Sequence, residues 1–218
     1  MKRVLILVEG QTGETFTRDI LGPHLQSVEV LLTPTLSSTK RVKVGPDFKG
    51  GVVSWGKVRN DLRRLLGDSN AVLVTTMLDY YGLPSDFPGM DGRPPGSCFD
   101  RVRHVETAMA RDIADGRFFP YLQLHEFEAL LFSDPSEVAG RFPGTGALAA
   151  LHRARQAVDS PEEINEGHDS CPSRRISAAV SVYQKPLHGP QIAAAIGLEQ
   201  IRAECRHFDE WVARLESL

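Results

Sequence analysis

The chain has 218 residues, of which 41% are hydrophobic and 24% charged, a composition that supports the core of an ordinary globular protein. Lys and Arg number 25 and Asp and Glu 28, so the net charge of −3 excludes the strongly basic balance typical of a DNA-reading domain. The three cysteines form no Cys-x-x-Cys pair, which disfavours a disulfide framework or a cysteine zinc site. Neither a membrane-spanning apolar run nor a signal peptide is visible. We therefore expect a cytoplasmic protein with no membrane partner.

The first part of the chain alternates apolar runs with amphipathic segments. Alternation of this kind predicts an α/β fold with an open, mostly parallel sheet. A segment rich in glycine, serine and lysine at 37–53 is expected to hold short strands near 42–44 and 52–53 or to form a mobile loop there. Pro34 is expected to end the second strand. The main strands are predicted at 4–8, 28–32, 71–78 and 118–124, and the helices between them at 14–25, 57–66 and 99–114.

From residue 125 the pattern becomes helical. A helix is predicted to start at 125–132, and 191–218 is expected to form two short helices that meet at Gly197. A long loop rich in proline and glycine follows Asp79, and such loops are usually functional. We predict an α/β core at 1–134 and a helical extension at 135–218 that packs on it, in a single compact unit.

Acidic residues follow three of the predicted strands. Glu9 comes directly after the first strand, Asp79 directly after the strand at 71–78, and Glu126 closely after the strand at 118–124. Because ligands of open α/β sheets bind at the carboxyl ends of the strands, these carboxylates are expected to meet at one site. Oxygen ligands suit Mg²⁺ or Mn²⁺, which activate water in phosphodiester cleavage.

Each acid also has a structural interpretation. Glu9 precedes a helix, where a carboxylate favours the positive end of the dipole, and Asp79 could fix its loop through an Asx-turn. On a helix Glu126 and Glu128 would point about 200° apart, so both reach one ion only if the backbone is extended there.

Other polar groups lie close to these acids in the sequence. His125 is a candidate general base or acid, although a histidine that ends a strand is more often simply hydrogen-bonded. The loop around Arg93, the helical Arg174 and Lys185 are candidate phosphate contacts, although arginines on helices are usually solvated. The turn from Gly10 to Gly13 is an alternative phosphate site, although it lacks the Walker A and Gly-x-Gly-x-x-Gly patterns.

Several segments resemble a known family. Val8-Glu9-Gly10-Gln11-Thr12 resembles the first motif of TOPRIM domains, close to the form found in overcoming-lysogenization-defect (OLD) type nucleases. Segments along nearly the whole chain resemble a TOPRIM-like family, domain of unknown function four-two-seven-six. They are Thr75 to Pro84, Asp86 to Gly89, His125 to Phe132, Pro172 to Ile176, and Ile201 to Cys205 with its continuation to Trp211.

This resemblance implies a TOPRIM/Rossmann-like fold and a metal-dependent nuclease. Glu9 matches the TOPRIM glutamate that binds metal or acts as general acid and base, and Asp79 matches the first acid of the Asp-x-Asp motif. Tyr81 takes the place of the second acid. Gly13 takes the place of a glutamate, with Glu14 directly after it. Glu126 and Glu128 are expected to replace the missing ligands.

We therefore predict a Mg²⁺- or Mn²⁺-dependent nuclease that cleaves DNA or RNA as the nuclease component of an ATPase-linked prokaryotic antiviral defence system. The alternative is a catalytically degenerate binding or regulatory partner of an ABC/AAA-type ATPase, and a third candidate is a nucleotide-binding enzyme that uses the Gly10 turn. The predicted site residues fall in three groups: catalytic Glu9, Asp79 and His125; metal-binding Glu9, Asp79, Glu126 and Glu128; and supporting or substrate-binding Glu14, Tyr81, Arg174 and Lys185.

Overall fold

The computed structural model describes residues 1–37, 52, 54–164 and 170–218. The chain forms two compact units, the first made of Met1–Leu122 with Leu218 and the second of Gln123–Ser217. The division between them therefore lies at residues 122 and 123, whereas the sequence predicts the change from α/β core to helical extension at 134.

The first unit contains a parallel sheet, which confirms the predicted α/β class. Its strands are β1 (Lys2–Val8), β2 (Val30–Leu36), β3 (Ala71–Asp79) and β4 (Phe118–Phe119). Their order is β2-β1-β3-β4, and the short β5 (Leu122–Gln123) also pairs with β3. Residues Val4 to Val8 of β1 are all buried, as expected for a strand covered on both faces.

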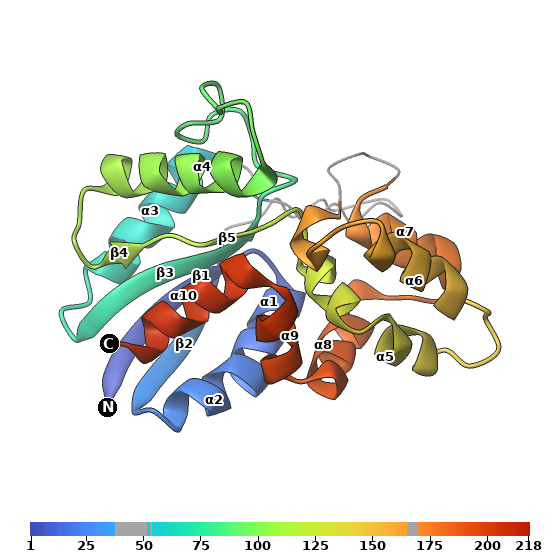
Figure 1. The fold of residues 1–218 in the computed structure, drawn as a ribbon. Helices are drawn as coiled ribbons and strands as arrows, with labels where there is room; N and C mark the ends of the chain where they lie inside the picture. The colour runs from blue at the N-terminus through green and yellow to red at the C-terminus, as the bar shows by residue number, and fades with distance from the viewer. Residues whose placement is uncertain (38–51, 53, 165–169) are drawn as a thin grey trace, which may run out of the picture. The chain divides into compact units, whose positions relative to one another are not determined.

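Helices flank this sheet on both faces. The chain runs from β1 outward to β2 and then back across β1 to β3. Because crossovers between parallel strands are almost always right-handed, this reversal of direction is expected to place successive connections on opposite faces. Figure 1 shows α3 and α4 together on one side of the strands and the α1–α2 segment on the other. The connections are α1 (Gln11–Phe16), a π-helical turn at Thr17–Leu21, α2 (Gly22–Gln26), α3 (Trp55–Leu66) and α4 (Cys98–Ile113).

The prediction that Pro34 ends the second strand is wrong. β2 continues to Leu36, with Pro34 opposite Ile6 of β1. The backbone N–H of Lys2 donates to the carbonyl of Glu29, and the backbone N–H of Ser37 donates to the carbonyl of Val8. The backbone N–H and C=O groups of the odd-numbered residues along β2 therefore point toward β1. The backbone nitrogen of Pro34 therefore points away from β1, so the N–H that proline lacks removes no hydrogen bond to β1.

The predicted single strand at 118–124 is interrupted. β4 and β5 are separated by Pro120 and Tyr121. The buried Thr76 replaces ladder bonds there: its hydroxyl donates to the Tyr121 carbonyl over 2.8 Å and accepts from the Tyr121 N–H over 3.0 Å. A side chain of β3 thus satisfies the backbone where proline cannot donate.

The second unit is helical, as the sequence predicts for the C-terminal part. The helix expected from His125 begins only at Phe127, and it is a 3-10 helix. Two helices do meet at Gly197, which has φ 84°, but Cys205 divides the second of them. The elements are η2 (Phe127–Ser133), α5 (Pro135–Gly140), α6 (Leu148–Gln156), η3 (Pro161–Glu163), α7 (Pro172–Ala179), α8 (Lys185–Ile196), α9 (Leu198–Glu204) and α10 (Arg206–Glu216).

Two further expectations concern segments that the structure covers only in part. The strands expected near 42–44 and 52–53 lie outside the described residues, apart from Val52, which belongs to no helix or strand. Among the described helices, none combines the length and the apolar character that crossing a membrane requires.

Candidate functional site

Glu9 and Asp79 lie at the carboxyl edge of two neighbouring parallel strands. β1 ends at Val8 opposite Met77 of β3, so Glu9, one residue after Val8, and Asp79, two residues after Met77, lie at the same edge of the sheet. The backbone N–H of Asp79 donates to Oε2 of Glu9 over 2.8 Å, and both residues are partly buried. The strand order reverses between β2-β1 and β1-β3, and ligands of open α/β sheets bind at such a switch point.

The turn after β1 leads directly into α1. Gly10 has an extended backbone, and the helix begins at Gln11, three residues earlier than predicted. Gly13 therefore lies inside the first turn, where an added Cβ would come 3.5 Å from Cβ of Val8. Glu14 is one residue further along the helix, rotated by about 100°. Its side chain thus cannot take the direction of a glutamate at position 13.

Tyr81, which the resemblance to TOPRIM domains predicts to stand in place of a second acid, is 36% exposed. Its neighbour Tyr80 is buried, with 2% exposed, and its hydroxyl accepts a hydrogen bond from Nη1 of Arg93 over 3.1 Å. The residues directly after Asp79 thus provide one exposed aromatic side chain and one buried anchor for the loop.

The second unit contains the densest cluster of charged groups among the predicted site residues. Nζ of Lys185 lies 3.1 Å from Oε1 of Glu126 and 3.2 Å from Oε2 of Glu128. The two carboxyl side chains are 10% and 1% exposed, whereas the lysine is 44% exposed. Lys185, predicted as a substrate contact, therefore acts as the counter-ion of two carboxylates predicted as metal ligands.

The backbone at His125 explains how both carboxylates reach one ammonium. His125 has φ 60°, an uncommon left-handed conformation for a residue with a Cβ, and Glu126 is extended with φ −145°. Only then does the 3-10 helix begin, so the two glutamates are not separated by a helical rotation. The His125 side chain is 2% exposed.

Two partners of the carboxylates carry no acidic or basic signal in the sequence. Ser173 donates to Glu126 twice, from its backbone N–H over 2.9 Å and from its hydroxyl over 3.0 Å. The hydroxyl of Tyr183 donates to Oε1 of Glu128 over 3.3 Å. Pro172 at the start of α7 is the one sequence signal near Ser173, since proline favours the first turn of a helix.

The pKa values of Glu126 and Glu128 are shifted in opposite directions by their surroundings. Burial opposes ionisation of Glu126, but the charge of Lys185 and the hydrogen bonds from Ser173 outweigh it and hold the pKa below its usual range. For Glu128 burial prevails, helped by the neighbouring Glu126 charge, and raises the pKa despite Lys185. Burial next to Glu128 also raises the pKa of the Tyr183 hydroxyl, so Tyr183 remains a hydrogen-bond donor.

The donor sets differ in how well they suit a divalent cation. In the parts of the chain that the structure describes, no group of three His, Cys, Asp or Glu side chains is arranged to hold a metal ion. Glu9 and Asp79 match the smaller set of one or two carboxylates by which Mg²⁺ is bound when water and substrate phosphates complete its coordination. Glu126 and Glu128 do not suit a cation in this arrangement, because the ammonium already compensates them.

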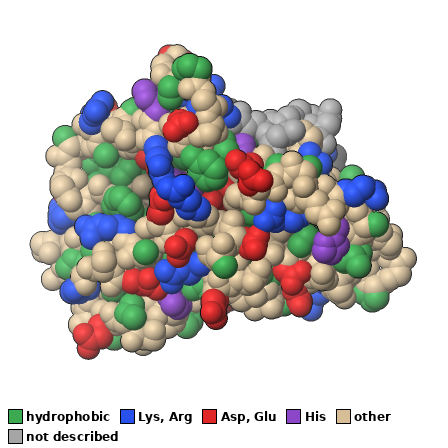
Figure 2. Space-filling view, viewed as in Figure 1, with side chains coloured by type: hydrophobic (Ala, Val, Ile, Leu, Met, Phe, Trp, Pro, Cys, Tyr) green, Lys and Arg blue, Asp and Glu red, His purple; other side chains and the backbone are tan. Residues whose placement is uncertain are grey.

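The predicted site residues differ in exposure, and they are divided between the two units. Arg174 is exposed on α7, and Glu14 is partly buried on α1. Glu9 and Asp79 belong to the first unit, and His125, Glu126, Glu128 and Lys185 belong to the second. Figure 2 shows acidic and basic side chains interspersed over the face in view, without a broad patch of one sign.

These features define the class of the protein: an α/β protein whose parallel sheet has two acidic residues at its switch point. The chain belongs to the family described as Domain of unknown function (DUF4276), whose model matches residues 8–216. The predicted resemblance to that family is thereby confirmed, while the wider relationship to TOPRIM domains stays a prediction. No curated protein matches the chain, and neither does any solved structure.

Proposed function

We propose that the protein is a divalent-metal-dependent phosphodiesterase that acts on nucleic acid, with its centre at Glu9 and Asp79. The observation that supports this most is the 2.8 Å hydrogen bond from the Asp79 N–H to Oε2 of Glu9. It joins two acidic residues at the switch point of a parallel sheet, where ligands of this architecture bind. The resemblance to TOPRIM nucleases adds the expected reaction class and the prokaryotic defence setting.

In this proposal Glu9 and Asp79 hold Mg²⁺ or Mn²⁺. When bound there, the ion would supply activation of water and stabilisation of the charge on the phosphate oxygens. Glu9 starts from a fixed position because a backbone N–H of β3 holds one of its oxygens. The ion pairs of Lys185 with Glu126 and Glu128 stabilise the second unit in this proposal and do not bind the metal.

The test is nicking of supercoiled plasmid in Mn²⁺ by the full chain. Glu9→Gln and Asp79→Asn are each expected to reduce the rate at least about a hundredfold. Asp19→Asn, which removes an exposed carboxylate of the same unit, is the matched control and should leave the rate unchanged. Full activity of Asp79→Asn would contradict the assignment of this centre.

A second candidate is a regulatory or binding partner of an ABC/AAA-type ATPase without catalysis of its own. The observation that favours it is Tyr81, which is exposed at the position where the TOPRIM nucleases that the chain resembles have an acid. The two candidates differ in one measurement. A wild-type chain that binds Mn²⁺ poorly in calorimetry and nicks no plasmid, alone or with its ATPase, would favour the binding role.

A further inference from the structure

The loop between β3 and α4 is fixed to the first unit by several independent contacts. In Figure 1 it rises above α4. Phe87, 2% exposed, packs edge-on against Trp55 with 5.1 Å between the ring centroids. The Asp86 carboxylate accepts a hydrogen bond from the backbone N–H of Trp55 over 3.0 Å. Gly89 lies so close to α4 that an added Cβ would come within 3.0 Å of Ala108. These contacts hold the loop against α3 and α4.

Arg93 is the basic side chain that this loop holds in place. Its Nε donates to the Met90 carbonyl over 3.0 Å, and Nη1 donates to the Tyr80 hydroxyl over 3.1 Å. Its guanidinium carbon lies 6.0 Å from the centre of the Tyr80 ring, at the outer limit of a cation–π contact. The guanidinium is therefore oriented by one neighbour in the loop and by the residue directly after Asp79.

The partners of Arg93 leave its charge uncompensated. Both are neutral acceptors, and no carboxylate among the described residues, the exposed Asp91 of the same loop included, forms an ion pair with it. Other arginines of this unit are paired: Arg59 with Asp112 at 3.0 Å and Arg117 with Asp115 at 3.0 Å. Arg93 is nevertheless exposed. An oriented guanidinium with spare N–H groups and full charge is suited to bind phosphate oxygens.

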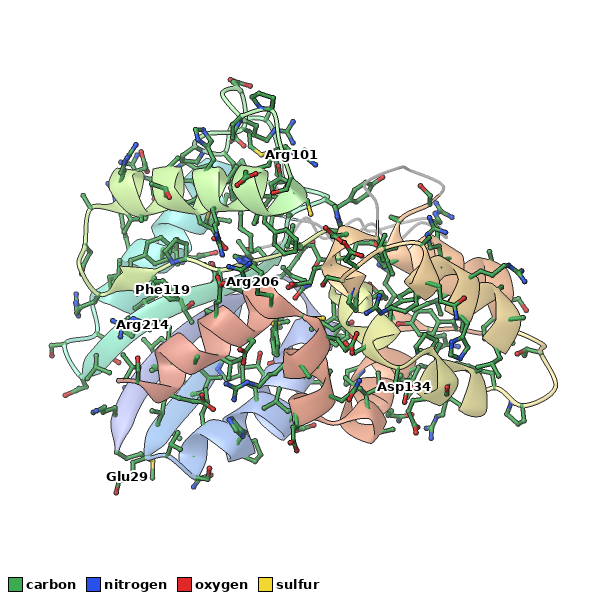
Figure 3. The ribbon with its side chains drawn as sticks, in the orientation of Figure 1. Glu29, Arg101, Phe119, Asp134, Arg206 and Arg214 are labelled. Atoms are coloured by element: carbon green, nitrogen blue, oxygen red, sulfur yellow. The ribbon has the colours of Figure 1, made fainter. Side chains whose placement is uncertain are left out.

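A second arginine reinforces the same loop. Nη1 of Arg101 donates to the Gly96 carbonyl over 2.7 Å. Figure 3 shows Arg101 at the end of α4 where the loop enters the helix. The loop thus begins at Tyr80, next to Asp79, and ends where Arg101 in the first turn of α4 holds the Gly96 carbonyl, with Arg93 between these two points.

We infer that Arg93 binds a backbone phosphate of the nucleic acid substrate and that Tyr80 is its positioning residue. This inference rests on the proposed function, since it assigns the substrate contact of the centre at Glu9 and Asp79. The ligand chemistry is a phosphodiester group, recognised by charge and by donors in a fixed direction. Contacts of this type fix the position of the strand and carry no base specificity.

The test is binding of a short fluorescein-labelled single-stranded oligonucleotide to the full chain in EDTA, at several salt concentrations. Arg93→Gln should weaken binding about tenfold at low salt and reduce the slope of log affinity against log salt by about one. Tyr80→Phe keeps the charge but loses the anchoring hydroxyl. It should weaken binding by a smaller factor and leave the slope unchanged.

The control is Arg64→Gln, which removes an exposed charge of α3 in the same unit and should change neither affinity nor slope. Arg93→Lys retains the charge, so it should keep the slope and lose affinity, which separates a phosphate contact from a folding defect.

If Arg93→Gln binds with unchanged affinity while the wild type nicks plasmid in a metal-dependent way, the inference is overturned and the proposed function stands. Binding that depends on Arg93 without any nicking would support the inference and overturn the proposed function. Absence of binding by the wild type would overturn both.

Discussion

Nζ of Lys185 lies 3.2 Å from Oε2 of Glu128, a carboxylate whose side chain is 1% exposed. Because water barely reaches that carboxylate, the ammonium supplies most of its charge compensation. The same ammonium lies 3.1 Å from Oε1 of Glu126. A single lysine at the start of α8 thus joins that helix to the segment in which η2 begins.

Replacement of Lys185 by Met should lower the free energy of unfolding by about 2 kcal/mol, since two buried carboxylates lose their counter-ion while the lysine itself is partly solvated. Urea unfolding near neutral pH measures this loss. Lys57→Met, at an exposed lysine of α3, is the control and should change stability by less than about 0.5 kcal/mol. Adding Glu128→Gln to Lys185→Met should recover part of the loss. Wild-type stability of Lys185→Met would show that the pair contributes little.

Glu128→Gln should make stability less sensitive to rising pH. Burial raises the pKa of Glu128 above its ordinary 4.5. The stability contributed by such a group is fully present below the unfolded pKa and is lost as pH rises through the folded pKa. The variant lacks this loss, so its free energy of unfolding relative to wild type should increase between about pH 4 and pH 8.

Glu126→Gln provides the contrast. Although burial opposes its ionisation, Lys185 and Ser173 hold the pKa of Glu126 below its ordinary value, so its contribution is present above the unfolded pKa and is lost as pH falls. This variant should therefore become less stable relative to wild type as pH rises. Urea unfolding at a series of pH values gives both trends, and trends of equal sign would contradict the separation of the two carboxyl groups.

Thr76→Val should cost about 2 kcal/mol of stability. Valine has nearly the same shape as threonine, but it leaves both the N–H and the carbonyl of Tyr121 without the bonds that the buried hydroxyl makes. Thermal and urea unfolding measure the loss. Thr33→Val, at a partly exposed position of β2, is the matched control and should have little effect. Equal stability of the two variants would contradict the role of the hydroxyl.

Gly89→Ala should destabilise the loop that carries Arg93. Gly89 has φ 81°, and the new methyl group would lie 3.0 Å from Cβ of Ala108 and 3.1 Å from Cδ2 of His104. Strain and contact together are expected to cost about 1 to 2 kcal/mol. Gly92→Ala has only an ordinary contact of 3.7 Å with His104 and serves as control. Limited proteolysis of the loop should accelerate in the first variant and not in the second.

The sequence predicts the edge of the sheet well and the charged cluster poorly. Glu9 directly follows the apolar run of β1, and Asp79 ends β3, a mostly apolar strand. Their places therefore follow from the strand pattern and from the geometry of parallel sheets. The contacts of Lys185 with Glu126 and Glu128 span 59 and 57 residues of chain, and no local periodicity encodes them. The left-handed backbone at His125 was equally hidden, since a helical pattern continues through the neighbouring residues.

The loop after β3 shows the same division. Its glycine and proline content predicts an irregular segment, which the structure confirms, but nothing local indicates that Arg93 would bond to Tyr80, 13 residues earlier. Strand ends can be located from apolar runs, whereas the partners of a loop side chain depend on how the whole segment packs. Pro34 failed as a strand end for a related reason, because its effect depends on which side of β2 it faces.

The outward position of Pro34 also affects association between molecules. Of the described strands, β2 lies at one border of the sheet, and its exposed Leu31 and Leu36 are 42% and 45% accessible. A second copy that docked there strand against strand would meet a gap in the row of donors at Pro34 and would face the rigid pyrrolidine ring. Proline at this place therefore disfavours β-aggregation and domain swapping through an edge strand that exposes apolar side chains.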